Sequence, residues 1–363
     1  MDEALPSVPR KGRGAVSNAA GRFEPATHIA IDDGWGRNDE DAPPLDTQYL
    51  RDTSKTVIAR NNSPDIGFDR SINPYRGCEH GCIYCFARPT HAYLGLSPGL
   101  DFESRIFVKE DAPALLRAEL SKPSYKPKPI ALGVNTDAYQ PIEKKLGLTR
   151  RILEVLAEFR HPVTLITKSA LIQRDLDILS AMARDHLAKA AVSVTTLDRG
   201  LARKMEPRAA TPERRLETIA ALSAAGIPTA VMAAPMIPAL NDAELEAILE
   251  AAVERGACAA GYVLLRLPLE LAGLFEEWLA NNVPGKAKHV MSLIKQSREG
   301  KAYQSEWGTR MSGTGPYAEM LRVRHEAACH RLGLDKKREN RQLDCSLFRV
   351  PARGKETAQL SLF

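Results

Sequence analysis

Residues 76–85 read Arg76-Gly77-Cys78-Glu79-His80-Gly81-Cys82-Ile83-Tyr84-Cys85, and this stretch decides how the rest of the chain is interpreted. Its three cysteines have the spacing C-x3-C-x2-C on one short loop. Three thiolates held this close together can bind three irons of a cubane iron–sulfur cluster. The fourth iron then has no protein ligand and is open to a substrate or cofactor. The loop therefore predicts a reactive metal centre rather than a structural cross-link.

Structural zinc is the first alternative for this loop. Zinc sites usually combine two pairs of cysteines, or cysteine pairs followed by spaced histidines. Here His80 lies between two of the cysteines, and no second cysteine pair follows. A chance trio of buried cysteines is the other alternative, and the Gly- and Arg-rich flanks argue against it. We therefore prefer an iron–sulfur site formed by Cys78, Cys82 and Cys85.

The composition is that of a globular protein with a sizeable core, since the chain has 363 residues and 44% of them are hydrophobic. We find no apolar run of 18 or more residues and no secretory leader, so we expect a cytoplasmic protein without a membrane segment. Six cysteines in a chain of this length do not indicate a disulfide scaffold. Cys258, Cys329 and Cys345 are expected to be small buried residues. A net charge of +5 permits an anionic partner without requiring one.

Strand-like segments alternate with amphipathic helical segments from about residue 68 onward. Most strand-like segments are continuously apolar, which is typical of strands buried on both faces of a parallel sheet. They are residues 69–73, 129–134, 162–167, 190–195, 229–234 and 261–267, with a short outlying strand at 104–108. Helices are expected at 148–159, 211–225 and 241–255. Right-handed crossovers would wind these segments into an α/β fold, a partial, open TIM-like barrel of about six βα units.

The regions that flank this core domain, residues 67–284, have a different composition. Residues 1–66 are rich in Pro, Gly, Asp, Arg and Asn, and we expect a flexible or loosely draped arm. Residues 285–350 suit a helical C-terminal extension, followed by a polar tail at 351–363. In residues 321–355, ten Lys and Arg oppose four Asp and Glu. That excess indicates either a solvated helix surface or a contact with a phosphate backbone.

The cysteine loop resembles the signature of the radical S-adenosylmethionine (SAM) enzymes, C-x3-C-x-aromatic-C, with Tyr84 as the aromatic residue that would contact the cofactor. About residues 68–270 resemble the core domain of that family, and most closely its branch containing spore photoproduct lyase. The resemblance implies that the three cysteines hold a [4Fe–4S] cluster and that SAM chelates the open iron. One electron from the reduced cluster would break the S–C5′ bond, and the 5′-deoxyadenosyl radical would abstract hydrogen from a substrate.

The resemblance also implies cofactor contacts at the ends of the expected strands. Thr136 and Asp137, after the second strand, would bind the SAM amine. Lys168, after the third strand, would meet the SAM carboxylate as a point charge. Ser193, on the fourth strand, would hydrogen-bond the ribose or the methionine end of SAM. Ala234, at the end of the fifth strand, would let adenine approach the backbone.

One departure from that branch limits what it implies. Spore photoproduct lyase uses a cysteine near the end of the second strand to return hydrogen to its product, and residues 133–136 here contain no thiol. We therefore do not expect thymine-dimer repair by the same route, and we favour neither Tyr75 nor Tyr139 as a replacement donor. Glu206 and Pro207 do match the branch. The chain better resembles a bacterial group without an assigned function.

The chain ends in Gln359-Leu360-Ser361-Leu362-Phe363. This pentapeptide resembles the short segment by which bacterial DNA polymerases and repair proteins bind the sliding clamp. Leu362 and Phe363 would fill an apolar groove on the clamp, and Gln359 would fix the register. The alternative is a terminal segment folded back onto its own domain.

The leading hypothesis is a radical SAM enzyme with lyase-like chemistry that acts on nucleic acid or a nucleotide-like substrate, in repair or modification. It would need an electron donor such as flavodoxin or ferredoxin. One alternative is a non-enzymatic iron–sulfur protein that transfers electrons or senses redox state. Such a carrier would normally have a fourth cysteine near the trio, and none is evident in the sequence. A radical SAM enzyme acting on a small metabolite or a peptide is the other alternative.

Overall fold

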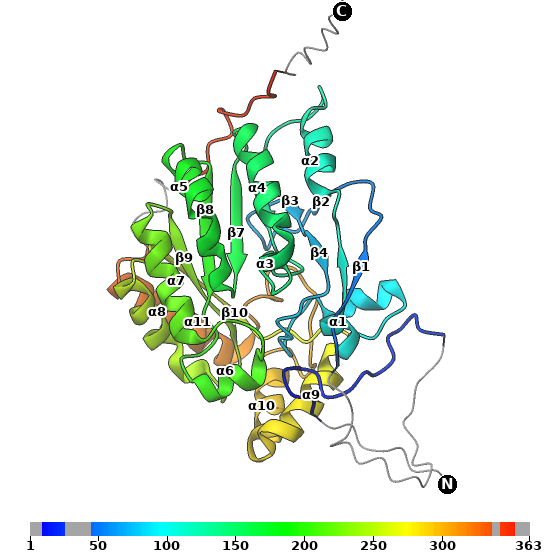
Figure 1. Cartoon of the computed structure of the whole chain (residues 1–363). Helices are drawn as coiled ribbons and strands as arrows, with labels where there is room; N and C mark the ends of the chain where they lie inside the picture. The colour runs from blue at the N-terminus through cyan, green and yellow to red at the C-terminus, as the bar shows by residue number, and fades with distance from the viewer. Residues whose placement is uncertain (1–8, 26–44, 336–341, 353–363) are drawn as a thin grey trace, which may run out of the picture.

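The computed structural model describes residues 9–25, 45–335 and 342–352 (Figure 1). Its centre is a seven-stranded sheet with the strand order β10-β9-β8-β7-β6-β3-β2. Every neighbouring pair in this sheet is parallel except β2 and β3, which are antiparallel. The six parallel strands are the six that the sequence predicts. They are β3 (Arg70–Ile72), β6 (Ile130–Leu132), β7 (Val163–Thr167), β8 (Ala188–Ser193), β9 (Thr229–Met236) and β10 (Ala259–Leu264).

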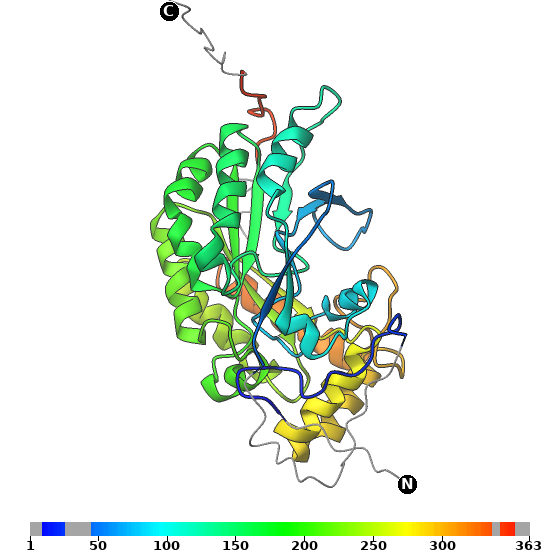
Figure 2. The same ribbon diagram turned by 45° about the vertical axis from the view of Figure 1, so that its right-hand side comes forward.

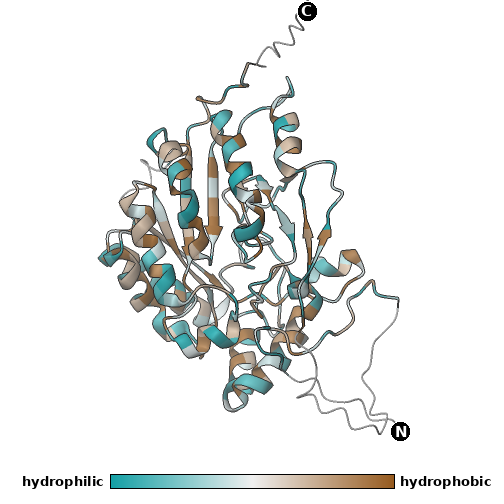
Figure 3. Cartoon of the chain, viewed as in Figure 1, coloured by the Kyte–Doolittle hydropathy of each residue, from teal (hydrophilic) through white to brown (hydrophobic). Residues whose placement is uncertain are grey.

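The crossover helices cover the outer face of this sheet, as Figure 2 shows. They are α2 (Ala112–Leu120), α4 (Leu148–Glu158), α5 (Leu176–Arg184), α7 (Pro212–Ala224) and α8 (Leu245–Glu254). Helix α7 begins as expected, because the Thr211 hydroxyl accepts a hydrogen bond from the Arg214 amide and Pro212 occupies the first turn. In Figure 3, hydrophobic residues fill most of β7, whereas the helices alternate hydrophobic and hydrophilic residues. The core therefore lies between the sheet and these helices.

The barrel does not close, which confirms the predicted open architecture. β10 and β2 (Ile58–Arg60) are the two edges of the sheet and do not pair with each other. The loop at residues 297–314 links the two edges instead. On the β10 side, the Leu264 amide donates to the Met311 carbonyl at 2.9 Å. On the β2 side, Arg310 forms an ion pair with Asp65, and the Gly308 amide donates to the Asp65 carboxylate at 2.6 Å.

A second, three-stranded sheet holds the expected outlying strand. β5 (Arg105–Val108) pairs in parallel with β1 (Gln48–Arg51) and antiparallel with β4 (Tyr75–Arg76). The strands β1 and β2 lie within residues 1–66, where the sequence indicates only a loosely draped arm. All four side chains of β1 are exposed, so backbone pairing rather than a buried face holds this strand. The sequence of such a strand does not alternate between apolar and polar residues, because neither of its faces is buried.

Three further helices follow the last strand. They are α9 (Leu271–Asn282), α10 (Pro284–Gln296) and α11 (Gly315–Arg331). Helices α10 and α11 form the predicted helical C-terminal extension, whereas α9 precedes its predicted start. Helix α11 packs against α8, and α9 packs against α10 near residues 9–25, as Figures 1 and 2 show. The division of the chain into domains stays a prediction. No helix in the described part of the chain is long and apolar enough to cross a membrane.

Candidate functional site

The cysteine loop lies directly after β4, at the end of the barrel where the parallel strands terminate. Backbone hydrogen bonds anchor it on two sides, from the Cys78 amide to the Phe102 carbonyl at 2.9 Å and from the Ile83 amide to the Met205 carbonyl at 3.0 Å. Gly77 has a φ of +82°, and a Cβ there would lie 2.8 Å from the Phe102 carbonyl oxygen. Only glycine therefore fits the turn that leads into the first cysteine.

The three predicted cluster ligands lie close enough to influence one another's ionisation. Cys78 and Cys82 are buried, and Cys85 is half-buried. Burial raises the pKa of Cys78, and the neighbouring groups Asp137, Cys82 and Cys85 raise it further. Burial likewise raises the pKa of Cys82. A bound metal would stabilise the thiolates of Cys78 and Cys82 against this effect of burial.

The chemistry of the donors suits an iron–sulfur cluster. In a cubane each thiolate binds a different iron, and Cys78, Cys82 and Cys85 on one loop supply three thiolates. Among residues 9–25, 45–335 and 342–352, no group of three or more His, Cys, Asp or Glu side chains is arranged to hold a single metal ion. The assignment of the three cysteines as cluster ligands stays a prediction.

A buried arginine holds the backbone of the loop from inside. The Arg88 guanidinium donates to the carbonyls of Cys82 at 2.9 Å and Gly81 at 3.1 Å. It also forms an ion pair with Glu103, and both side chains are 0% exposed. Glu103 in turn accepts hydrogen bonds from the amides of Gly14 at 2.9 Å and Ala15 at 2.8 Å. The sequence analysis did not identify this pair, because its members have no recognisable spacing.

Residues 13–17 of the N-terminal segment consequently pack against the cysteine loop. A Cβ on Gly14 would lie 1.8 Å from the Gly81 carbonyl oxygen, so the two backbones are in direct contact. Arg13 donates to the Glu103 carbonyl at 2.7 Å, and Ser17 donates to Glu277 at 2.7 Å. The glycine pair of Gly12-Arg13-Gly14 was the available signal for this close approach, since glycine is required where backbones meet.

A second buried network surrounds Tyr84, the aromatic residue of the signature. Its hydroxyl donates to Glu206, which also accepts from Thr195 at 2.7 Å and forms an ion pair with Arg215. Arg215 also donates to the Ser193 carbonyl at 3.1 Å. This network joins the cysteine loop to the end of β8. Glu206, noted only as a match to the lyase-like branch, thus has a definite structural role.

Lys168 and Asp137 meet beside the loop, at the ends of β7 and β6. The Lys168 ammonium lies 5.7 Å from the centroid of the Tyr84 ring. The Asp137 carboxylate accepts hydrogen bonds from Thr167 at 2.7 Å and from the Lys168 amide at 2.8 Å. The His80 ring nitrogen lies 3.3 Å from the same carboxylate. Burial alone raises the pKa of Asp137, but His80 and these donors outweigh it and bring the pKa down to about 2. Asp137 therefore links the loop to β7, and its contact with SAM stays a prediction.

The remaining predicted cofactor residues lie at the same end of the barrel. Thr136 is buried and donates to the Gly77 carbonyl at 2.7 Å. Ser193 is buried at the end of β8, beside the network around Glu206. The half-buried Ala234 lies near the end of β9, and its carbonyl accepts from Thr195 at 3.1 Å. All six predicted contacts are thus gathered around the cysteine loop.

The two tyrosines that we do not favour as hydrogen donors are enclosed in the interior. Tyr75 and Tyr139 are each 1% exposed. The Tyr75 hydroxyl donates to Glu143, and the Tyr139 hydroxyl donates to Asp175 at 3.1 Å. Burial raises the pKa of both tyrosines, and the neighbouring carboxylates raise it further. Both hydroxyl hydrogens are therefore engaged away from the cysteines.

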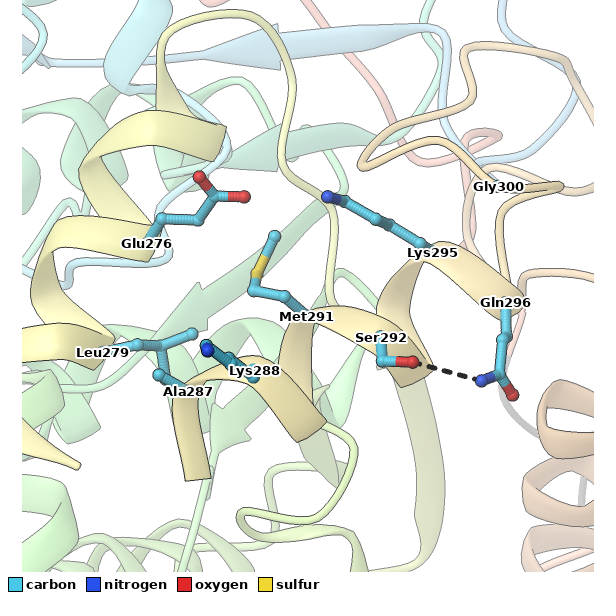
Figure 4. A pocket seen from close by; sticks show the side chains of 9 residues that line it. All are labelled: Glu276, Leu279, Ala287, Lys288, Met291, Ser292, Lys295, Gln296 and Gly300. Atoms are coloured by element: carbon cyan, nitrogen blue, oxygen red, sulfur yellow. Dashed lines mark hydrogen bonds between the residues drawn. The ribbon is translucent and has the colours of Figure 1, made fainter. Parts of the chain in front are cut away.

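Two surface pockets lie beside the loop rather than over its sulfurs. One, of about 660 Å³, is lined by residues of α9, α10 and the turn that follows (Figure 4). The other, of about 410 Å³, is lined by Tyr49, Glu79, Pro141, Ile142, Lys144, Lys145 and Arg208. Neither lining includes a cysteine.

Comparison with known proteins identifies the family. The model of the radical SAM superfamily matches residues 72–252. An uncharacterized protein of Mycobacterium tuberculosis is 39% identical over 65% of this chain and 70% of its own length. An uncharacterized protein of Methanocaldococcus jannaschii is 30% identical over 48% of this chain and 62% of its own length. The chain belongs to the radical SAM superfamily.

The fold agrees with that identification. A structure of spore photoproduct lyase complexed with dinucleoside spore photoproduct has a TM-score of 0.58 with this chain, at 14% identity. The alignment covers 78% of this chain and 79% of the lyase. The protein is a radical SAM enzyme with a [4Fe–4S] cluster and SAM as its cofactors. The prediction of an enzyme is confirmed, and the alternative of a non-enzymatic carrier is not.

Proposed function

We propose that Cys78, Cys82 and Cys85 hold the [4Fe–4S] cluster and that the enzyme acts on a nucleic acid or nucleotide substrate. When bound, the reduced cluster supplies one electron to SAM, and the 5′-deoxyadenosyl radical so formed abstracts hydrogen from the substrate. Arg88 and Glu103 fix the backbone that presents the cysteines. The buried setting of the loop keeps water from the reacting atoms.

The residues at the strand ends would bind and orient SAM. Lys168 supplies a positive charge for the SAM carboxylate, and its position over Tyr84 keeps that charge beside the loop. Thr136 and Ser193 supply hydroxyl groups, and Ala234 leaves room beside the backbone. Lys168→Ala should weaken SAM binding at least several-fold while the cluster's absorbance spectrum stays intact.

One arginine carries the proposal about the substrate. Arg266 follows β10, and its guanidinium lies 5.1 Å from the ring centroid of Phe86, the residue after Cys85. Its charge acts on the neighbouring Arg298 guanidinium, and Arg266 also donates a hydrogen bond of 3.3 Å to the Met311 sulfur. Its Nε is buried without a hydrogen-bond partner, and Arg266 has no ion-pair partner within the described ranges. A partly buried cation without a counter-ion is costly unless a bound anion completes the site.

Exposed aromatic rings accompany this cation. Phe86 is 39% exposed, and Trp307, from the same loop as Met311, is 58% exposed. Cations combined with exposed rings are the usual means of binding single-stranded nucleic acid, because phosphates pair with the cation and bases stack on the rings. The fold shared with spore photoproduct lyase supports a substrate of this class, since that enzyme is described in complex with a dinucleoside photoproduct.

Repair or modification of DNA is the narrower form of this proposal. The terminal pentapeptide at 359–363 would bring the enzyme to the sliding clamp, but it lies outside the described residues. Deleting residues 359–363 should abolish retention on immobilised sliding clamp while leaving SAM cleavage unchanged. Unchanged retention would remove the clamp from the proposal.

The substrate proposal is tested by deuterium transfer. The anaerobically reconstituted enzyme is given dithionite, SAM and deuterated single-stranded or damaged DNA. We expect deuterium in the 5′-deoxyadenosine product. Arg266→Gln should weaken oligonucleotide binding about tenfold, which is about 1.4 kcal/mol, while SAM affinity is kept. If SAM affinity falls and oligonucleotide affinity does not, Arg266 binds the SAM carboxylate instead.

A carboxylate-bearing metabolite or peptide is the second candidate substrate, because Arg266 would pair with a carboxylate as well as with a phosphate. The absence of both oligonucleotide binding and deuterium transfer from DNA would favour it.

A further inference from the structure

Helices α9 and α10 share a hydrophobic cluster with the cysteine loop. Cys82, Ile83 and Tyr84 belong to one hydrophobic cluster with residues of these two helices. The helix residues of that cluster are Leu271, Leu274, Phe275, Trp278, Leu279, Val290, Met291 and Ile294. Trp278 is also hydrogen-bonded through its ring nitrogen to the Lys204 carbonyl at 3.2 Å. The packing of this helix pair is therefore continuous with that of the cysteine loop.

The outer side of the same helix pair carries the pocket of about 660 Å³ (Figure 4). Its apolar floor consists of Leu279, Ala287 and Met291. Leu279 and Met291 also belong to the cluster that contains Cys82, so the floor is continuous with the packing around the loop. In Figure 4 the charged ends of Glu276 and Lys295 point toward one another across the pocket.

Lysines outnumber acidic residues at this pocket. Lys288 and Lys295 line it together with Glu276. Lys286 and Lys301 are exposed on the same helix or the turn after it, which also carries the exposed Glu299. None of these four lysines forms an ion pair with another residue of the described ranges. Exposed cations without local partners attract an acidic surface and raise its rate of association.

We propose that this surface, formed by the pocket and Lys286, Lys288, Lys295 and Lys301, is the docking site of an acidic protein that carries one electron. The inference rests on the proposed function, because it takes the cluster to be held by the three cysteines. An apolar side chain of the carrier enters the pocket, and its acidic residues pair with the lysines. The carrier is oxidised by one electron and the cluster is reduced by one electron. No proton or group is transferred.

An acidic protein fits this surface better than nucleic acid does. The lining residues include no aromatic ring on which a base could stack. The cations suited to a substrate phosphate lie elsewhere, at Arg266 beside Phe86. The pocket and the proposed substrate contacts are thus separate sites on the molecule.

The test compares two reductants on the reconstituted full-length enzyme. The double variant Lys288→Glu/Lys295→Glu is matched by Lys144→Glu/Lys145→Glu, which makes the same charge change at the pocket of about 410 Å³. Reduction of the cluster is followed by stopped-flow absorbance with reduced flavodoxin, an acidic one-electron carrier, and separately with dithionite. With flavodoxin, we expect the first variant to be reduced at least about tenfold more slowly and with a weaker dependence on salt. With dithionite, it should match the wild type.

The matched variant should be reduced by flavodoxin at the wild-type rate. Equal rates in the wild type and Lys288→Glu/Lys295→Glu would overturn the proposal, and so would an equal loss in both double variants. Lys288→Gln/Lys295→Gln provides a milder version and should show a smaller loss in the same direction. Loss of oligonucleotide binding in the first variant would assign the surface to nucleic acid. Failure of dithionite to reduce any centre in the wild type would instead contradict the proposed function.

Discussion

Arg88 beneath the cysteine loop and the arginines of α11 are all paired with carboxylates, but in different surroundings. Arg88 and Glu103 are both 0% exposed, and the pair holds loop carbonyls and the N-terminal segment at once. Arg322 on α11 is 46% exposed and pairs with Glu319 and Glu326 on its own helix. Breaking a buried pair leaves a charge without water or partner, whereas exposed pairs contribute little to stability. Only the first kind of pair fixes the geometry of a site.

The same comparison bears on the basic stretch at residues 321–355. Arg324 pairs with Glu246 and Arg331 pairs with Glu250, in addition to the pairs of Arg322. The arginines of α11 are therefore already matched by carboxylates. This favours the solvated helix surface over the phosphate contact for α11. The lysines of α10 present the unpaired positive charge that α11 lacks.

The largest effect is expected from breaking the buried pair. Glu103→Gln removes the carboxylate and leaves the Arg88 guanidinium without a counter-ion. We expect a loss of about 3–5 kcal/mol in the free energy of unfolding. Urea denaturation of the cluster-free protein measures it. Arg88→Met/Glu103→Leu is the control and should lose less than Glu103→Gln, and a loss below about 1 kcal/mol for Glu103→Gln would contradict the comparison.

Burial of a neutral group should produce a pH effect of similar size. His161 is buried, with its ring nitrogens 2.7 Å from the Tyr125 hydroxyl and 3.0 Å from the Pro162 carbonyl oxygen. Burial lowers the pKa of His161 from 6.5 to about 4. The unfolded chain then binds the proton more readily than the folded protein, so stability is full above pH 6.5 and is lost as the pH falls toward 4. The loss is about 3 kcal/mol.

Thermal or urea unfolding at pH 7 and pH 4.5 checks this expectation. His161→Gln keeps a polar side chain that does not titrate in this range. The variant should lose less stability than the wild type between the two pH values. Parallel losses in both proteins would show that other groups govern the acid sensitivity.

An intermediate effect is expected at Arg324, which is half-buried where α11 meets α8. Its guanidinium donates to Glu246 at 2.8 Å and 2.6 Å and to the Asp242 carbonyl at 3.1 Å. Arg324→Ala should cost about 1 kcal/mol, since the pair joins two helices but is open to water. A loss as large as that of Glu103→Gln would erase the distinction between the two regions.

The smallest effect is expected at Arg322, which pairs only within its own helix. Arg322→Ala should change the free energy of unfolding by less than about 0.5 kcal/mol. It should also leave oligonucleotide affinity unchanged, in contrast to Arg266→Gln. Affinity for the oligonucleotide is measured by fluorescence anisotropy. A tenfold weaker affinity would show that α11 is part of the substrate-binding site.

The parts of the fold that the sequence predicted are those with a local signal. β7 is a run of apolar and β-branched residues, β9 is apolar after Thr229, and Thr211 with Pro212 marks the start of α7. The cysteine spacing likewise located the loop. We did not predict the pair of Arg88 and Glu103, the backbone contact of Gly14 with the cysteine loop, or the strand β1. They depend on contacts between residues far apart in the chain or on exposed backbone pairing, neither of which leaves a periodic pattern.

The central claim is that three cysteines hold a cluster with one iron open to SAM. The most direct measurement is electron paramagnetic resonance of the reduced, anaerobically reconstituted protein before and after SAM is added, with 5′-deoxyadenosine measured in the same samples. We predict a [4Fe–4S] signal that SAM changes, together with 5′-deoxyadenosine, and neither in Cys82→Ala. A signal that SAM leaves unchanged, a cluster with four protein ligands, or zinc in place of iron would contradict the claim.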